Sequence, residues 1–170
     1  MSRPIRGVAF AAAVSVISHP LAALSASAAT KPLNACTVFT EGEVRRIGGT
    51  AAAGVVDLSI PPEMHDIGGG GTDCGVGLVE MQLDPVPVSG FGSFKKAAAK
   101  EGKQTKLSGI GDEAYLYETR DGVASQVAVL MRVGKHVLTM QLAPIEEREI
   151  AAARKSLTAL AKAAVAKLKK

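Results

Sequence analysis

The chain has 170 residues, of which 47% are hydrophobic, 21% charged and only 4% aromatic, and its formal net charge is +4. This length predicts one domain with a buried core, and the high apolar fraction excludes a chain that is disordered throughout. The lysines and arginines are not interleaved with aromatic residues, so we expect no nucleic-acid partner.

Residues 1–28 have the pattern of a secretory signal peptide. Two arginines supply the positive charge, the apolar run VAFAAAVSVI follows, and small residues stand before Ala29. We expect cleavage near Ala28 and Ala29, and therefore a periplasmic or extracellular protein. The alternative is a retained membrane helix, but a span needs about 20 consecutive apolar residues and Pro20 interrupts this run.

Cleavage would leave residues 29–170 as a single domain whose net charge is small. Removing Arg3 and Arg6 leaves 18 basic residues against 16 acidic ones, a balance of +2. Five of the remaining lysines lie in the C-terminal segment, so the rest of the domain is slightly acidic.

Two cysteines, Cys36 and Cys74, remain after cleavage. In an oxidising compartment such a pair is expected to form a disulfide. A loop whose ends are 38 positions apart would gain about 3–4 kcal/mol in the chain-entropy model. Two alternatives stay open: LNAC, which ends at Cys36, has the outline of a lipobox, and a zinc site would draw on His65 and His136.

The first predicted helix begins at a capping box, with Thr40 as the N-cap and Glu43 as the third helical residue. Val44 and Ile47 face inward from this short helix. A pair of glycines follows them and ends it.

Residues 50–72 are rich in Ala, Gly and Pro, and they predict one short strand around Leu58 and a loop at the run GGGG. A phosphate-binding loop is excluded because no Gly-Lys-Ser/Thr follows the glycines. Glu63, His65 and Asp66 form the only compact set of potential metal ligands. Because these ligands are so few, we expect no metal and no cofactor.

The sequence CGVGLVEMQL, residues 74–83, predicts one strand, which Pro85 ends. Ser93 is the expected cap of a short helix over residues 94–100. The lysine-rich stretch 95–106 reads as a solvated face rather than a binding site.

The second half of the chain predicts a three-stranded antiparallel meander. A turn over residues 107–114 leads into a strand over 114–118, and an RDG turn follows it. Apolar and polar residues then alternate along 123–131 and 136–142, with a Gly-Lys turn between them.

Apolar residues recur with helical spacing over residues 145–168. Glutamates precede this stretch and lysines follow, which is the order that the helix dipole favours. The apolar stripe consists of Ala, Ile and Leu without aromatics, so we expect it to pack on the sheet rather than on a membrane surface.

Together these elements predict an α+β fold. It comprises a short N-terminal helix, an antiparallel sheet of about four to five strands, and a long C-terminal helix packed on that sheet.

No Gly-x-Ser-x-Gly elbow and no facing pair of carboxylates is recognisable, so we do not expect an enzyme. The candidate binding surface is the turn LSGIGDEA near the Gly-rich loop, with Gly109, Gly111, Asp112 and Glu113, because loops on rigid scaffolds carry function. The structural alternative is that Asp112 hydrogen-bonds the turn backbone.

The order of these motifs resembles a known family. NACTVFT, a helix, a second cysteine, LSGIGDEA, two strands and an Ala-rich C-terminal helix follow one another. This order resembles that of small secreted or lipid-anchored bacterial proteins, best known among actinobacterial lipoproteins, whose domain has no assigned function. The resemblance implies a disulfide between Cys36 and Cys74 and a sheet with helices on it, similar to PsbP-like α/β/α sandwiches. It supplies no catalytic residues.

We therefore expect an exported, non-enzymatic binding or accessory protein of the bacterial envelope. Its partner would be a small molecule or an envelope protein that the sequence does not identify. The alternatives are an envelope hydrolase without a recognisable motif, and a surface-attached structural protein or lipoprotein.

Overall fold

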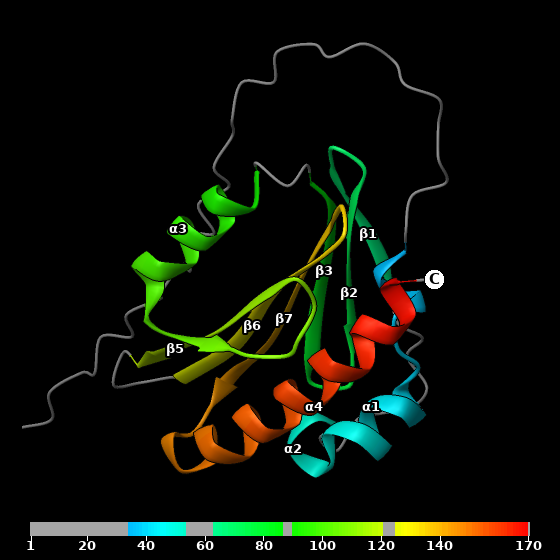
Figure 1. Ribbon diagram of the computed structural model, residues 1–170. Coiled ribbons are helices and arrows are strands. Elements are labelled where there is room, and N and C mark those ends of the chain that lie inside the picture. Colours follow the sequence, from blue (N-terminus) through cyan, green and yellow to red (C-terminus); the bar gives the residue numbers. More distant parts are fainter. Residues whose placement is uncertain (1–33, 54–62, 87–89, 121–124, 170) are drawn as a thin grey trace, which may run out of the picture. The chain divides into compact units, whose positions relative to one another are not determined.

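A computed structural model describes residues 34–53, 63–86, 90–120 and 125–169 (Figure 1). These residues belong to one compact unit, Lys31–Lys170. The expected signal peptide, the strand around Leu58 and the RDG turn lie outside the described residues.

Seven antiparallel strands form one sheet. Their bounds are β1 Met64–Gly68, β2 Gly71–Val76, β3 Val79–Pro85, β4 Lys103–Leu107, β5 Glu113–Arg120, β6 Ser125–Val133 and β7 His136–Ile145. The strand order is β1-β2-β3-β7-β6-β5-β4, so β1 and β4 are the two edges. This confirms the α+β class, but the predicted count of four to five strands was too low.

The described helices are short except for the last one. Their bounds are η1 Ala35–Thr37, α1 Glu41–Gly48, α2 Thr50–Ala53, α3 Phe91–Glu101, η3 Glu147–Glu149 and α4 Ile150–Leu168. The predicted capping box at α1 is confirmed, because the Thr40 hydroxyl accepts from the Glu43 N–H and the Glu43 carboxylate accepts from the Thr40 N–H. No described helix has the length and apolar character that a membrane crossing requires.

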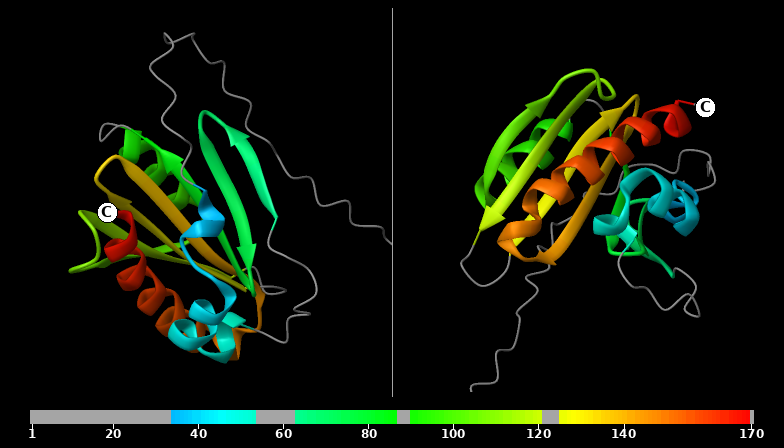
Figure 2. Two further views of the ribbon diagram at one scale, coloured as in Figure 1. Left: turned by 90° about the vertical axis from the view of Figure 1, so that its right-hand side faces the viewer. Right: turned by 90° about the horizontal axis from the view of Figure 1, so that it is seen from below.

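Helices cover both faces of the sheet (Figures 1 and 2). The α4 face is the one on which α4 packs over β6 and β7, with α1 and α2 beside α4. It holds the main core, which includes the fully buried Val129, Met140 and Leu160. The α3 face carries a smaller cluster of Phe91, Tyr117, Leu130 and Val137 under α3. Successive strand residues alternate between these two faces.

Two predicted elements needed correction around β1 to β3. The single strand expected over residues 74–83 is a hairpin, because Gly77 and Leu78 form a two-residue turn in which Val76 pairs with Val79. The run GGGG, predicted as a loop, forms the turn between β1 and β2, and its first and last glycines belong to those strands. Three successive glycines in it have positive φ angles of 83°, 63° and 81°, a conformation that other residues rarely adopt.

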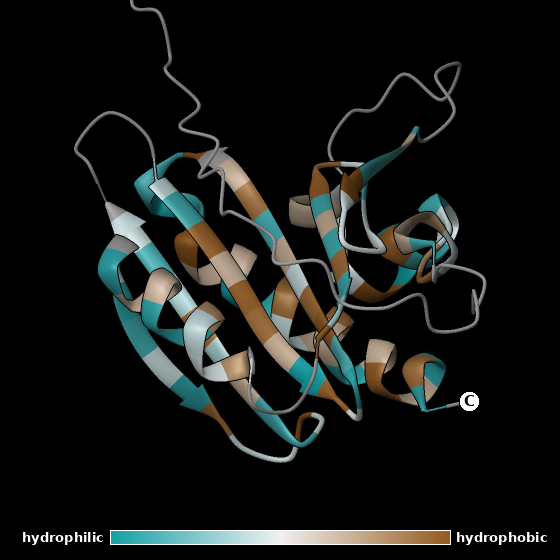
Figure 3. Cartoon of the chain, turned by 90° about the horizontal axis from the view of Figure 1, so that it is seen from above, coloured by the Kyte–Doolittle hydropathy of each residue, from teal (hydrophilic) through white to brown (hydrophobic). Residues whose placement is uncertain are grey.

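Smaller corrections concern the helices. α3 begins at Phe91 after Gly90, without a side-chain cap, so Ser93 is not its cap. The C-terminal helix begins at Ile150, because a 3-10 turn occupies the glutamate-rich segment before it. The predicted meander of β5, β6 and β7 is confirmed. Figure 3 shows hydrophobic segments within the strands of the sheet and hydrophilic residues near several strand ends.

Candidate functional site

The predicted turn between β4 and β5 is anchored within the fold. Gly109 and Gly111 have φ angles of 73° and 58°, and a Cβ on Gly111 would lie 2.5 Å from the carbonyl oxygen of Arg132. Ile110 between them is only 2% exposed and belongs to the core of the α4 face. The two glycines therefore allow the chain to bend sharply against β6 while Ile110 inserts into the core.

Asp112 connects this turn to the neighbouring turn between β6 and β7. Its N–H donates to the Arg132 carbonyl at 2.9 Å, and its carboxylate accepts from the Gly134 N–H at 2.7 Å and from Arg132 Nη1 at 3.1 Å. The contacts of Asp112 thus agree with the structural alternative: it bonds turn backbone, although the backbone belongs to the next turn.

Glu113 fastens α3 to β5. Its carboxylate accepts from the Tyr115 hydroxyl and from Lys95 Nζ, the latter at 3.3 Å, and Lys95 also lies 5.1 Å from the centre of the Tyr115 ring. The hydrogen bond from Tyr115, with the charge of Lys95, lowers the pKa of Glu113. The pKa of Lys95 is raised by its hydrogen bonds to Tyr115 and Glu113.

A groove of about 280 Å³ lies on the α3 face, between α3 and the sheet. Its apolar wall is formed by helix and strand residues together, whereas the polar residues of its described lining all come from β5, β6 and β7. The lining comprises Phe94, Ala97, Ala98, Tyr117, Thr119, Gln126, Ala128, Leu130, Thr139 and Gln141.

The groove exists because small residues stand where larger ones would fill the space. In the register of the sheet, Ala128 lies between Tyr117 on β5 and Gln141 on β7. Ala97 and Ala98 face this row from α3. A methyl group on each side cannot bridge the distance between helix and sheet, so a hollow remains above Ala128.

Tyr117 forms a rigid wall of the groove. It is only 4% exposed, and its hydroxyl oxygen accepts from Gln104 Nε2 at 3.1 Å. Burial, followed by the charge of Tyr115, raises the pKa of Tyr117, so this phenol keeps its proton at neutral pH.

Two glutamine side chains lie at the end of the groove away from Lys95. Gln126 Nε2 donates to Gln141 Oε1 at 2.6 Å, and Gln141 Nε2 donates to the carboxylate of Glu80 on β3. In the register of the sheet, Gln141 on β7 lies opposite Glu80 on β3 and opposite Ala128 on β6. The hydrogen-bonded side chains therefore run across three neighbouring strands.

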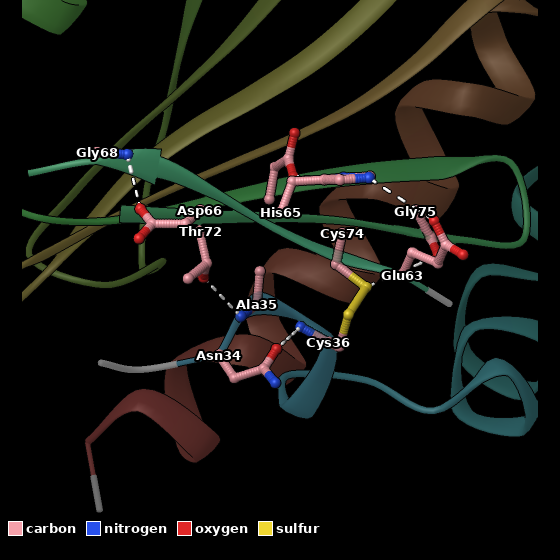
Figure 4. Close-up of polar contacts among 11 residues, drawn as sticks. Asn34, Ala35, Cys36, Glu63, His65, Asp66, Gly68, Thr72, Cys74 and Gly75 are labelled. Carbon is pink, nitrogen blue, oxygen red and sulfur yellow. Dashed lines mark hydrogen bonds and ion pairs between the residues drawn. A yellow bond between two sulfur atoms is a disulfide. The ribbon is translucent and has the colours of Figure 1, made fainter. Parts of the chain in front are cut away.

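The predicted disulfide joins η1 to β2 on the other side of the sheet (Figure 4). Cys36 and Cys74 are bonded, with their Cα atoms 5.2 Å apart. The Ala35 N–H beside it donates to the buried Thr72 hydroxyl at 2.9 Å, so the N-terminal segment is attached to β2 twice. Both cysteines are therefore occupied by each other rather than by zinc or a lipid.

The compact acid and histidine set does not converge on one point. His65 Nδ1 lies 3.0 Å from Asp73 Oδ1, and its Nε2 lies 3.9 Å from Glu63 Oε2. Asp66 instead accepts from the Gly68 N–H at 2.8 Å, in the turn of the hairpin (Figure 4). Within the described ranges, no group of three or more His, Cys, Asp or Glu is arranged to hold a metal ion.

A second hollow, of about 320 Å³, lies over the hairpin of β2 and β3. Polar and glycine residues contribute much of its lining, among them His65, Asp73, Gly75 and Glu80. It is the more open of the two hollows, so the groove under α3 encloses a ligand better.

The residues of the predicted binding turn therefore do not line the groove. The register places Glu113 opposite Arg132 at one end of the sheet and Thr119 opposite Gln126 at the other. The turn over residues 107–114 and the glycine turn between β1 and β2 lie at the same end of the sheet. The strands that they join are not adjacent to one another in the sheet. The groove was not predicted from the sequence. Gln126 and Ala128, a polar and a small residue on one side of β6, are only a local signal for it, because the other lining residues lie far away in the sequence.

Comparison of the chain with models of known protein families, with curated proteins and with solved structures found no match.

Proposed function

We propose that this chain is an exported, non-enzymatic binding protein that holds a small, largely apolar molecule in the groove between α3 and the sheet. The observation that carries the proposal is the hollow above Ala128, which is walled by Tyr117 and Leu130 and roofed by α3. Ligand sites are typically concave, mostly apolar and equipped with a few polar groups, and the groove has this composition.

The chemistry of the lining supports binding rather than catalysis. Among the described residues that line the groove, Tyr117 is the one titratable side chain, and its pKa is raised, away from the range of a general base at neutral pH. The remaining polar groups are hydroxyls and amides, which orient a ligand by hydrogen bonding.

Export is supported by the disulfide between Cys36 and Cys74, since disulfides persist in oxidising compartments. The bonded cysteines and the helices on both faces of the sheet also support membership of the family that the motif order resembles. Intact-mass measurement of the protein from its own envelope tests export. We expect the mass of a chain that begins at Ala29 or Thr30, reduced by two hydrogens for the disulfide. The mass of an acylated chain that begins at Cys36 would contradict the disulfide and show a lipoprotein instead.

Ligand binding is tested by filling the groove. Octanol, an apolar chain with one hydroxyl, is titrated into the protein and followed by ligand-detected NMR. Ala128→Leu places a larger side chain in the hollow, so we expect affinity to fall at least about tenfold, as for loss of one well-buried group. Ala151→Leu is the matched control, because Ala151 is exposed on α4. Equal affinity in the Ala128 variant and the wild type would overturn the proposal.

A further inference from the structure

The amide relay, defined as Glu80, Gln141 and Gln126, has a fixed direction. A carboxylate only accepts hydrogen bonds, so the amide of Gln141 must turn its NH₂ group toward Glu80. Its carbonyl oxygen then faces Gln126 and accepts from that side chain's NH₂ group at 2.6 Å. One charged group on β3 thereby determines how two neutral amides are oriented on β7 and β6.

The relay ends in a hydrogen-bond acceptor at the groove. With its NH₂ group directed to Gln141, Gln126 has a carbonyl oxygen with no hydrogen bond to any described residue. The negative charge at the other end of the relay polarises both amides in the sense that makes this oxygen a better acceptor. Gln126 is half-buried, and a ligand seated in the groove would cover its oxygen further. A ligand that covers this acceptor without offering a donor leaves it unpaired, which is costly, so a ligand that supplies a donor is favoured.

The described lining of the groove brings no positive charge to the relay. Among the described residues that line the groove there is no lysine or arginine. Lys95, on the same helix as Phe94, is engaged by Glu113 and Tyr115 near the opposite end of the sheet. An anionic group placed beside Gln126 would meet a carbonyl oxygen and the field of Glu80, and the described lining offers no cation to compensate.

We propose, on the basis of the proposed function, that the ligand carries a hydrogen-bond donor at one end of its apolar body and that the amide relay selects for it. Hydroxyl and ammonium groups satisfy this requirement, and a carboxylate does not. Glu80 acts as a positioning residue, because it orients Gln141 and Gln126, and Gln126 contacts the ligand.

Three probes with the same chain test the selection: octanol, octylamine and octanoate. We expect the wild type to bind octanol and octylamine about tenfold more tightly than octanoate, the size of one unmatched hydrogen-bonding group. In Glu80→Gln the terminal amide can present either of its atoms to Gln141, so the relay loses its direction. The preference should then shrink toward equality while binding of octanol persists.

The control is Glu41→Gln, which removes one negative charge from α1, outside the groove and the relay. It should leave the preference at its wild-type value. A preference that survives in Glu80→Gln would overturn the role of the relay. Equal binding of all three probes to the wild type, with loss in Ala128→Leu, would overturn the selection but keep the proposed function. Failure of every probe to bind would overturn both.

Discussion

The two faces of the sheet are built from the same strands but are closed in different ways. On the α4 face, Val129, Met140 and Leu160 are completely buried and the helix lies directly on the strands. On the α3 face, Ala128 and Gln141 are the strand neighbours of Val129 and Met140 and point the other way. They leave a groove under α3.

This difference shows how one sheet can serve two purposes. Because neighbouring strand residues point to opposite faces, the stability that the α4 face supplies does not depend on tight packing under α3. The α3 face can then keep small and polar side chains at positions that a core would fill with larger ones. Stability and the proposed ligand binding thus fall to alternate residues of β5, β6 and β7.

Truncation of one leucine on each face would test this division most directly. Leu138 is fully buried on the α4 face, and Leu130, 3% exposed, borders the groove on the α3 face. We expect Leu138→Ala to lower the free energy of unfolding by about 4 kcal/mol and Leu130→Ala by about 2 kcal/mol, because the second site is already partly hollow. Urea unfolding followed by circular dichroism measures both; equal losses would mean that the two faces are packed alike.

Substitution of Asp112 would sharpen the comparison at the predicted binding turn. Asp112→Ala removes the bonds to the Gly134 N–H and to Arg132, so we expect a loss of about 1 kcal/mol in unfolding free energy. Octanol binding in the groove should not change, whereas Asp112→Asn, which keeps an acceptor, should cost less stability. If Asp112→Ala abolished binding in a folded protein, the turn rather than the groove would be the working surface.

Lowering the pH should weaken the attachment of helices on both faces of the sheet. We expect this loss of unfolding free energy to be smaller than the losses in the leucine and Asp112 variants. On the α4 side, hydrogen bonds from Lys167 and Thr40 lower the pKa of Glu43 to about 2. A lowered pKa contributes stability above the ordinary value of 4.5, and this contribution is lost as the pH falls from 4.5 toward 2. The lowered pKa of Glu113, which fastens α3, acts in the same direction.

Glu43→Gln and Lys167→Met should therefore each flatten the acid limb of a plot of stability against pH. Both variants remove the same ion pair, so their combination should flatten it little further. An unchanged slope in both single variants would show that this pair does not contribute to the closure of the α4 face.

The meander and the long helix could be predicted because their burial follows a simple period. Ser125 to Val133 alternates between the two faces, and α4 repeats buried residues every three or four positions. β1 and β4 could not be predicted in the same way, because almost every residue in these edge strands is exposed and no apolar alternation marks them. The lysines of β4, read as a solvated face, are typical of a protected sheet edge.

The disulfide could be predicted from two cysteines and the expected compartment, but the groove could not. Ala128, Gln141 and Phe94 are separated along the chain and meet only after the strands have paired and α3 has packed. Nor does any local pattern reveal that Asp112 bonds the next turn, since its partners lie 20 and 22 positions away.

Helix α4, which packs on β6 and β7 over the main core, also bears on the timing of folding. Its contacts reach back to α1, and Lys167 bonds Glu43 over 124 positions of sequence. Until α4 has been synthesised, the apolar side of β6 and β7 lacks the helix that covers it in the described fold, so the core of the α4 face stays incomplete. Under the export that we propose, such a delay would keep the chain unfolded until it has been transported.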